Sequence, residues 1–471
     1  FYLKLQSRVT AYRGERVKQK GSMTAAMSIL LLVLLSLITV SIQSSRTACA
    51  RAQAVNSMDT GLYSLFSEYD RELLERYNLF FLDASYNTGR IQIAQVLNHL
   101  EDYMKPVLDS GLTKCAVQIC AADGFRAASD KNGAAVKQQI IRYMKENLGN
   151  AGIEALLKKT EEEKQVLEEQ ENIKNNGMEE INPEETTPMP EISETNNPLE
   201  IIKSFKENGF LSFVLPSGVN VSEKTIDLSA VLSKRERQQG MGDFPELEAE
   251  EGFADKIFIQ EYAFEKFQSF TDGAETPLAY EIEYLLGGKE GDRENLSSVV
   301  KKLLLLREIS NLAFLYTNPQ KRGELAACAS ALSFLLLIPE GMTFVQGVLA
   351  AGWAYIEGIA DVKALLSGGC VPLVKDSGSW KTQLSDLRAD TGITTEKGAD
   401  YEEYLRILLM SVPEQELVMR IMDVIEVNLR QEEGKEKFAF DACIDTVAVS
   451  FQIAGPENKI WQAERMYSYD M

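Results

Sequence analysis

The spacing of apolar and polar positions along the chain first sets one segment apart. Residues 23–42 read MTAAMSILLLVLLSLITVSI and contain no charged side chain. At 1.5 Å per residue, about 20 such residues form a helix that spans a hydrocarbon core of roughly 30 Å. The only polar side chains are hydroxyls, which bond back to helix carbonyls. The pattern predicts a transmembrane helix over 22–43.

The helical period continues beyond this segment. Apolar residues recur at spacings of three and four as far as Phe80, with charged residues mostly between them. Such a stripe predicts an amphipathic helix that continues the first one to about residue 81. We expect this stalk to pack through a stripe that includes Leu62, Phe66, Tyr69, Leu73, Tyr77 and Phe80.

Charge predicts how the helix is oriented. Residues 1–21 carry six lysines and arginines against one acid, Glu15. The whole chain has 70 acidic and 49 basic residues, a formal charge of −21 and a pI near 4.7. By the positive-inside rule the basic segment stays in the cytoplasm. The sequence therefore predicts a single-pass cell-membrane protein whose acidic bulk is extracytoplasmic.

A cleaved signal peptide and a lipoprotein signal are the two alternatives to a membrane anchor for the apolar segment. A cleaved signal peptide would use the small residues 48–50, but the apolar run is longer than the usual h-region of about 7–15 residues. A lipoprotein would need small apolar residues before Cys49, where the chain has Arg46 and Thr47. The anchor is favoured over both.

The remaining chain predicts an α+β fold that is mainly helical, with small antiparallel sheets. Residues 173–197 are rich in acids and proline and predict a linker between a first extracytoplasmic domain, 44–172, and a second, 198–471. Periodicity predicts helices at 87–108, 131–172, 253–270, 295–316, 399–411 and 413–431, and strands at 112–120, 278–286 and 438–453. Neither apolar stretch of 325–366 suits a membrane span, because 325–338 has only 14 residues and polar residues interrupt 342–366. We expect a buried helical hairpin there, with membrane insertion left open.

Several segments resemble a known family. The basic leader, residues 21–26 (GSMTAA) and the apolar run ending at Arg46 resemble the N-terminus of TadE/TadG-like proteins of the tight-adherence pilus system. Residues 65–73, 77–83, 353–375 and 420–430 are similar to an uncharacterised group of such proteins from Gram-positive anaerobes, a domain of unknown function. In type IV pilins a glutamate stands five residues after the cleavage glycine. Counted from Gly21, that position here is Ala26, which favours an assembly protein over a major filament subunit.

Composition and motifs predict little chemistry. The single histidine, His99, cannot build a multi-imidazole zinc site, and the acidic charge disfavours nucleic-acid binding. Phosphate-binding glycine motifs, a nucleophile elbow and C-x-x-C spacings are absent from the sequence. Paired carboxylates of a glycosidase would have to come from Glu281, Glu283, Glu357 or Asp361, and a weak calcium cluster from Asp292, Glu294 and Asn295. We expect no enzyme activity, no cofactor and no metal.

The resemblance and the anchor together imply a function. We expect a non-enzymatic structural or assembly component of a Tad-like, type IV-related pilus or envelope secretion apparatus. Its partners would be the lipid bilayer and other pilin-like proteins or further copies of itself. Helix packing would involve Gly21, Ala25, Ala26, Ser28, Ser36 and Thr39. The alternative is a membrane-tethered extracytoplasmic ligand-binding or sensing protein, and a remote third is a wall hydrolase.

Overall fold

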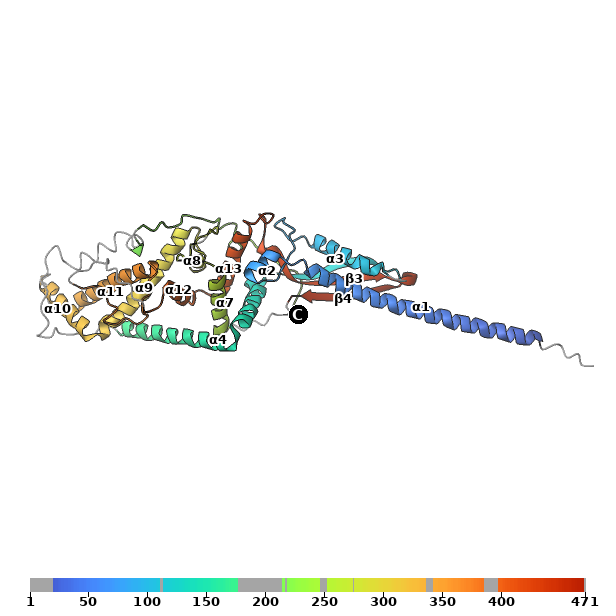
Figure 1. Ribbon diagram of the computed structural model, residues 1–471, viewed down its shortest axis with the longest axis horizontal. Coiled ribbons are helices and arrows are strands. Elements are labelled where there is room, and N and C mark those ends of the chain that lie inside the picture. Colours follow the sequence, from blue (N-terminus) through green and yellow to red (C-terminus); the bar gives the residue numbers. More distant parts are fainter. Residues whose placement is uncertain are drawn as a thin grey trace, which may run out of the picture. The chain divides into compact units, whose positions relative to one another are not determined.

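The computed structural model divides into two compact units, each made of separated stretches of chain (Figure 1). The structure describes residues 20–110, 113–176, 214–216, 218–245, 252–273, 275–335, 342–384 and 397–469. The described part of the first unit covers 20–67, 94–110, 113–123 and 448–467, and the second unit takes the rest. Most of the predicted basic segment 1–21 and of the predicted linker 173–197 lies outside the described residues.

The first unit is built on α1 (Lys20–Phe66), which has no proline and only one glycine after the apolar run. Its outer half packs against α3 (Ile93–Leu108), and the close approach is at Gly61, where a Cβ atom would lie 2.6 Å from Met104 Cγ. Leu62 and Phe66 are buried on the same half of the helix. The predicted amphipathic extension is therefore confirmed as far as Phe66.

The helix does not continue to residue 81 as predicted. It ends at Phe66, and α2 (Arg71–Tyr77) is a separate helix in the second unit. Asp70 starts α2 because its extended backbone breaks the helical path and its carboxylate accepts from Leu73 N at 3.0 Å. Asn78 ends α2 in the left-handed conformation, with φ 55°. The polar turn Ser67–Asp70 interrupts a stripe whose apolar spacing alone gave no sign of a break.

A small antiparallel sheet has the strand order β1-β3-β2, with β4 paired to β3. Its strands are β1 (Leu82–Asp83), β2 (Ala116–Ala127), β3 (Cys443–Ala454) and β4 (Ile460–Ser468). The register pairs Leu82 with Ile444 and Asp83 with Cys443. The predicted strands at 112–120 and 438–453 are found as β2 and β3, each shifted toward the C-terminus. β4 was not predicted, and a turn with the short helix η4 (Pro456–Asn458) joins it to β3.

The second unit is a helical body. Its remaining helices are α4 (Asp130–Asn175), α7 (Phe253–Lys266), α8 (Glu281–Gly287), α9 (Asp292–Thr317), α10 (Pro319–Leu335), α11 (Met342–Leu366), α12 (Tyr401–Leu409) and α13 (Glu414–Leu429), with the short η3 (Phe440–Ala442) before β3. One apolar core joins α2, α4, α7, α8, α9, α12 and α13, and a second lies among α9, α10 and α11 around Trp353. The predicted mainly helical α+β fold with a small sheet is confirmed.

α4 contains two backbone breaks. Lys131, Asn132 and Gly133 have φ values of 50°, 58° and 81°, so a left-handed turn precedes the regular helix. A Cβ atom on Gly133 would lie 2.9 Å from both Met422 Sδ and Val418 Cγ1, so close packing as well as conformation selects glycine. Gly149, with φ 62°, interrupts the helix again in open space.

One predicted strand was wrong. Residues 278–286 were expected to form a strand, but residues from Glu281 onward form α8, whose side chains are almost all buried. Burial on all sides removes the amphipathic period that distinguishes a short helix from a strand in sequence. Gly288 ends α8 with φ 60°, and Gly368 follows α11 with φ 81°, as expected of glycines that terminate an element.

The apolar stretch 325–366 forms the helices α10 and α11 with residues 336–341, which lie outside the described residues, between them. α11 packs mainly on α9, and its central residues, including Trp353, are fully buried. Gln346, Glu357 and Asp361, which interrupt the apolar run, are buried as well. The stretch therefore forms part of the core of the second unit, as predicted.

Candidate functional site

The apolar half of α1 is the first candidate site. Within the described residues, α1 is the one helix long and apolar enough to cross a membrane, and none of its most apolar window is buried by the protein. Every side chain from Met23 to Ile42 is exposed. A contiguous apolar surface of this size on a water-soluble protein would be strongly unfavourable, and lipid or other apolar helices would cover it.

The hydroxyls of this half are satisfied within the helix. Ser28 Oγ donates to Thr24 O at 2.8 Å, Ser36 Oγ to Val33 O at 2.8 Å, and Thr39 Oγ1 to Leu35 O at 2.7 Å. These bonds lower the cost of placing the hydroxyls in hydrocarbon while leaving each oxygen able to accept a further bond. The predicted back-bonding is confirmed.

The residues predicted for helix packing are not all on one face. Ala25, Ser28, Ser36 and Thr39 follow spacings of three or four or their sums, so they share one face of α1 with Leu32. Ala26 is one position from Ala25 and points about 100° away. Gly21 lies four positions before Ala25, in the first turn of α1. Of the residues predicted for helix packing, Ala25, Ser28, Ser36 and Thr39 therefore form one narrow face of α1, and Ala26 lies outside it.

The outer half of α1 is fastened to the first unit by a residue that the sequence did not indicate. Gln53 Nε2 donates to the carbonyl oxygens of Val107, Leu108 and Ser110 at 2.6, 3.2 and 2.5 Å, and Gln53 Oε1 accepts from Thr113 Oγ1. One amide therefore adds hydrogen bonds to carbonyls at and just beyond the end of α3. No local pattern distinguishes this glutamine from other polar residues on the helix.

A hollow lies where α1 leaves its apolar half. It measures about 840 Å³ and is bounded on one side by α1 and on the other by the turn between β3 and β4. Lys459 Nζ of that turn donates to Thr47 Oγ1 at 3.2 Å. The lining residues are Val40, Gln43, Ser44, Thr47, Ala48, Arg51, Ala52, Val55, Asn56, Glu457, Lys459 and Trp461.

The rest of the predicted stalk stripe belongs to the second unit. Leu73 and Tyr77 are buried on α2, while Tyr69 is half-buried and Phe80 is exposed. The rings of Tyr69 and Phe80 meet edge to face with centroids 5.7 Å apart. These four residues therefore do not share a helix face with Leu62 and Phe66.

The carboxylates considered for catalysis lie in a buried ion cluster. Asp361 pairs with Arg307 at 3.1 Å, Lys375 at 2.6 Å and Lys381 at 3.6 Å, and Glu357 pairs with Lys375 at 2.7 Å. All five side chains are 3% exposed or less. The cluster joins α9 and α11 to the segment after α11, and neither carboxylate faces a cavity described above.

The charge states in this cluster are set by opposing effects. Burial alone would raise the pKa of Asp361, but Arg307, Lys375 and Lys381 lower it below its usual range. Burial lowers the pKa of Lys381 despite its acidic neighbours. Glu357 also accepts from the backbone amides of Lys381 and Thr382 at 2.8 Å each. Asp361 therefore stays ionised, and both carboxylates are fully engaged by protein partners, an arrangement that stabilises the fold.

Glu281 and Glu283 lie on the helix α8 and not on the strand predicted for 278–286. Both are buried on α8 and accept from backbone amides: Gln268 N to Glu281 at 3.0 Å, and Phe270 N to Glu283 at 2.9 Å. Burial raises the pKa of Glu283 to about 7, and hydrogen bonds from Phe270 N and the Tyr401 hydroxyl partly oppose it. These acids hold the segment after α7.

Two residues of the weak candidate calcium cluster, Asp292 and Asn295, are already hydrogen-bonded to other protein groups. Asp292 accepts from Ala279 N at 2.9 Å and from Ser222 Oγ at 2.5 Å, and Asn295 Oδ1 accepts from Lys289 N at 2.8 Å. Among the described residues, no group of three or more His, Cys, Asp or Glu side chains is arranged to hold a metal. His99 is half-buried on α3, in the position expected of a structural histidine.

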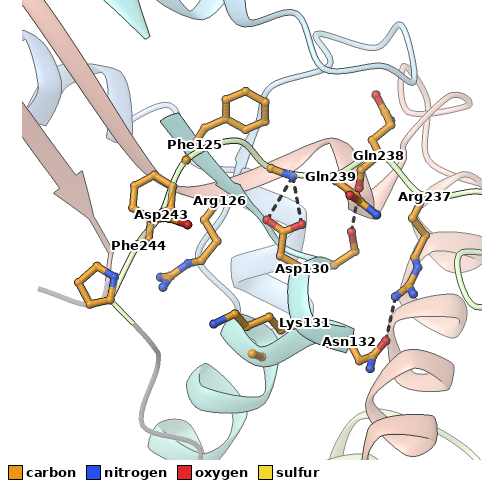
Figure 2. Close-up of a pocket in the computed structure, with 15 residues that line it drawn as sticks. Phe125, Arg126, Asp130, Lys131, Asn132, Arg237, Gln238, Gln239, Asp243 and Phe244 are labelled. Atoms are coloured by element: carbon orange, nitrogen blue, oxygen red, sulfur yellow. Dashed lines mark hydrogen bonds between the residues drawn. The ribbon is translucent and has the colours of Figure 1, made fainter. Parts of the chain in front are cut away.

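A polar cavity of about 470 Å³ adjoins the left-handed turn at the start of α4 (Figure 2). The Asp130 carboxylate accepts from Gly240 N at 3.0 Å and from Ala127 N at 2.8 Å, and Arg237 Nη1 donates to Asn132 Oδ1 at 3.2 Å. Arg126 is held in a bidentate pair with buried Asp445. These bonds tie the segment containing Arg237 and Gly240 to the start of α4, so Asp130, Asn132, Arg126 and Arg237 already have protein partners.

A larger groove of about 760 Å³ lies among α4, α7 and α12. Apolar side chains that include Leu156, Leu167 and Ile257 line it, and ion pairs of Arg406 with Glu261 at 3.0 Å and of Lys159 with Glu403 at 2.6 Å lie among its lining residues. Gln260 lines the groove, is 3% exposed, and its Nε2 has no hydrogen-bond partner.

The pKa values of two groups in the groove are shifted by burial. It raises the pKa of Glu163 and lowers that of Lys256, whose amine donates to Met410 O at 2.6 Å. A buried amide donor without a partner is costly, and an apolar groove with few polar groups is typical of a ligand site. No sequence motif indicated this groove, because its walls come from three helices far apart in the chain.

Comparison with known proteins identifies a family. Residues 189–455, more than half of the chain, match a family of unknown function, DUF5702. No curated protein matches the chain, and no solved structure does. The family match covers most of the second unit and β3, and it leaves α1 outside its bounds.

Proposed function

The chain belongs to the DUF5702 family of unknown function, and from this premise we propose a non-enzymatic, membrane-anchored structural or assembly component of an envelope apparatus. In the finer form of the proposal, the apparatus is a Tad-like, type IV-related pilus or secretion system. The N-terminal resemblance to TadE/TadG-like proteins supports that form, which the family match neither includes nor opposes.

The single observation that carries the proposal is the apolar half of α1. Residues 23–42 are uncharged and exposed, and their hydroxyls are bonded internally. A helix with these properties is compatible with hydrocarbon along its whole length. The second half of α1 packs into the first unit through Gln53, Leu62 and Phe66. One unbroken helix therefore connects the proposed anchor to the folded part of the chain.

Charge supports the orientation of the proposed anchor. The six basic residues of 1–21 favour a cytoplasmic N-terminus, and the acidic bulk then lies outside the cytoplasm. The net charge of −21 disfavours a nucleic-acid partner and suits subunit contacts with basic surfaces. The proposed location is the cell membrane.

Lateral contacts of the anchor would use its small-residue face. Ala25, Ser28, Ser36 and Thr39 let a second helix approach closely, and the hydroxyl oxygens can accept from it. The opposite face, which contains Leu30, Leu34 and Leu37, offers mostly large apolar side chains and suits lipid. The partner would be another single-helix envelope protein or a second copy of this chain.

Site-specific photo-crosslinking in membranes tests this function. A photoreactive amino acid at Ser36 is expected to crosslink the chain to a protein partner through its transmembrane helix. The same amino acid at Leu34, half a turn away, is the matched control and should label lipid. The readout is the mass of the crosslinked product on a denaturing gel and the identity of its peptides.

Two results would contradict the assembly function. Equal protein crosslinking from Ser36 and Leu34 would show that no face is specific. Labelling of lipid alone from both positions would show an anchor without lateral partners, which would leave the second candidate function below.

That second candidate is a membrane-tethered ligand-binding protein, and the groove with Gln260 favours it. Its ligand would carry apolar rings or chains and one hydrogen-bond acceptor for Gln260 Nε2. The third candidate, a wall hydrolase, draws no support from Glu357 or Asp361, because both are buried in ion pairs.

Benzophenone, which carries a carbonyl acceptor between two apolar rings, is the probe for the groove. Irradiation should label peptides of α4, α7 or α12 in a saturable way. Gln260→Leu should weaken this labelling about fivefold, the effect of losing one hydrogen bond of about 1 kcal/mol. Gln346→Leu is the matched control, because Gln346 is also buried with an unpartnered Nε2 but does not line the groove. Unsaturable labelling, or labelling that Gln260→Leu leaves intact, would contradict ligand binding there.

A further inference from the structure

The hollow between α1 and the β3–β4 turn, which lies wholly in the first unit, fits a component of the membrane itself. It extends along α1 from Val40, inside the apolar half, to Asn56. The inference that follows rests on the proposed placement of α1 in a bilayer, and it concerns what lies against the protein just outside the hydrocarbon.

Depth is the first argument. Thr47 follows Ile42, the last residue of the apolar half, by five positions, or about 7.5 Å along a helix. The polar headgroup layer on each side of a bilayer is about 5–7.5 Å thick, half the difference between a total of roughly 40–45 Å and a core of roughly 30 Å, so Thr47 lies at the outer edge of this layer. The bond from Lys459 Nζ to Thr47 Oγ1 therefore holds the β3–β4 turn at the level of the headgroups.

Charge is the second argument. The hollow is lined by two cations, Arg51 and Lys459, and by one acid, Glu457. A local excess of positive charge contrasts with the net charge of −21 of the whole chain. Cations at this level attract the phosphates of lipids, and more strongly those of anionic lipids.

The aromatic residue is the third argument. Trp461 lines the hollow, and its ring lies directly over Gly455, where a Cβ atom would be 2.1 Å from the ring. The absence of a side chain at Gly455 therefore lets the indole occupy a fixed position on the hairpin. Beside it, Ile460 is 53% exposed. Tryptophan is enriched at membrane interfaces because its ring is apolar and its N–H is polar.

We propose that this hollow binds the headgroup of a phospholipid of the surrounding bilayer. The lipid phosphate lies toward Lys459 and Arg51, its acyl chain runs along Val40, and Trp461 lies at the glycerol level. The hairpin is thus a second, shallow membrane contact that fixes the rotation of α1 and the height of the first unit above the bilayer.

Quenching of Trp461 fluorescence by brominated lipids tests the proposal on the full chain reconstituted in vesicles. Trp353 and Trp380 lie in the second unit, so the Trp461 contribution is the difference between the wild type and Trp461→Phe. Lipids brominated near the headgroup are expected to quench this difference signal more than lipids brominated near the chain end. Brominated phosphatidylglycerol is expected to quench it more than brominated phosphatidylcholine.

Charge reversal tests the two cations with the same quenching signal. The double variant Lys459→Glu, Arg51→Glu is expected to lose the preference for phosphatidylglycerol. Lys105→Glu, an exposed lysine on α3 that does not line the hollow, is the control and should keep it. An unchanged preference in the double variant would overturn the assignment of the two cations.

Carbonate extraction and Trp461 quenching together separate a failure of the lipid site from a failure of the membrane anchor. Resistance of the chain to alkaline carbonate extraction reports α1 insertion alone. If the chain resists extraction but Trp461 is not quenched by any brominated lipid, the lipid site is wrong and the anchor stands. If carbonate releases the chain, the anchor fails and the lipid site fails with it.

Discussion

Asp361→Ala is expected to remove about 3–5 kcal/mol from the free energy of unfolding of the second unit, the cost of breaking a buried ion pair. The substitution leaves Arg307, Lys375 and Lys381 with Glu357 as the one remaining acid of the cluster. Domains are stable by about 5–15 kcal/mol in total, so the variant should lose a large share of its stability and unfold at a much lower denaturant concentration than the wild type.

Denaturation by urea, followed by tryptophan fluorescence, measures this effect. Trp353 Nε1 donates to Thr382 Oγ1, and Trp353 meets Trp380 edge to face with centroids 5.3 Å apart, so both indoles report on the region around the cluster. Asp102→Ala is the matched control, because Asp102 forms an exposed pair with Lys105 at 2.6 Å, and its loss should leave the transition unchanged. A midpoint for Asp361→Ala that coincides with that of the wild type would contradict the structural role of the cluster.

Leu32→Arg combined with Leu35→Arg is expected to abolish stable membrane insertion of α1. Both leucines lie near the middle of the apolar half and are exposed. Each arginine at the centre of a transmembrane helix costs about 2.5–3.5 kcal/mol on insertion scales, so the pair costs about 5–7 kcal/mol. The measurement is the fraction of the chain that stays in the membrane pellet after alkaline carbonate extraction.

The control places the same charge outside the apolar half. Ser44→Arg with Ser45→Arg adds two arginines to α1 beyond Ile42, next to Arg46, and should leave the pelleted fraction unchanged. Loss of the chain from the pellet in both double variants would point to a general effect of charge on folding. Retention of the Leu32→Arg, Leu35→Arg variant would refute the membrane anchor.

The Asp361→Ala and the Leu32→Arg, Leu35→Arg experiments together would separate the role of the buried ion cluster from that of the apolar half of α1. The ion cluster of Arg307, Glu357 and Asp361 stabilises the helical body and has no proposed part in recognition. The apolar half of α1 adds nothing to the core, because the protein buries none of it. We therefore expect the Asp361 variant to remain membrane-bound and the arginine variant to keep the fold of its second unit.

Local pattern in the sequence was sufficient for several features. The uncharged run 23–42 is found as the exposed half of α1, and helices predicted from period are found as α3, α4, α7, α9, α12 and α13. These features depend on interactions within a few residues of the chain, so spacing alone indicates them.

Other features depend on residues far apart in the sequence. Complete burial in the helical body turns most of the predicted strand at 278–286 into α8. In the sequence, Glu357 and Asp361 are candidate catalytic carboxylates. In the structure they pair with Lys375 and Arg307, which come from other segments of the chain. Period and composition carry no information about such partners.

The sequence by itself therefore determined that one apolar helix leads into an acidic, mainly helical chain, because hydrophobicity and helical period are properties of neighbouring residues. Only the tertiary structure decided what the polar residues do. Gln53 closes the end of α3, Gln260 is left as a donor in a groove, and Lys459 meets Thr47 across more than 400 residues. Each of these contacts exists because folding brings distant segments within hydrogen-bond distance, and no local pattern specifies that.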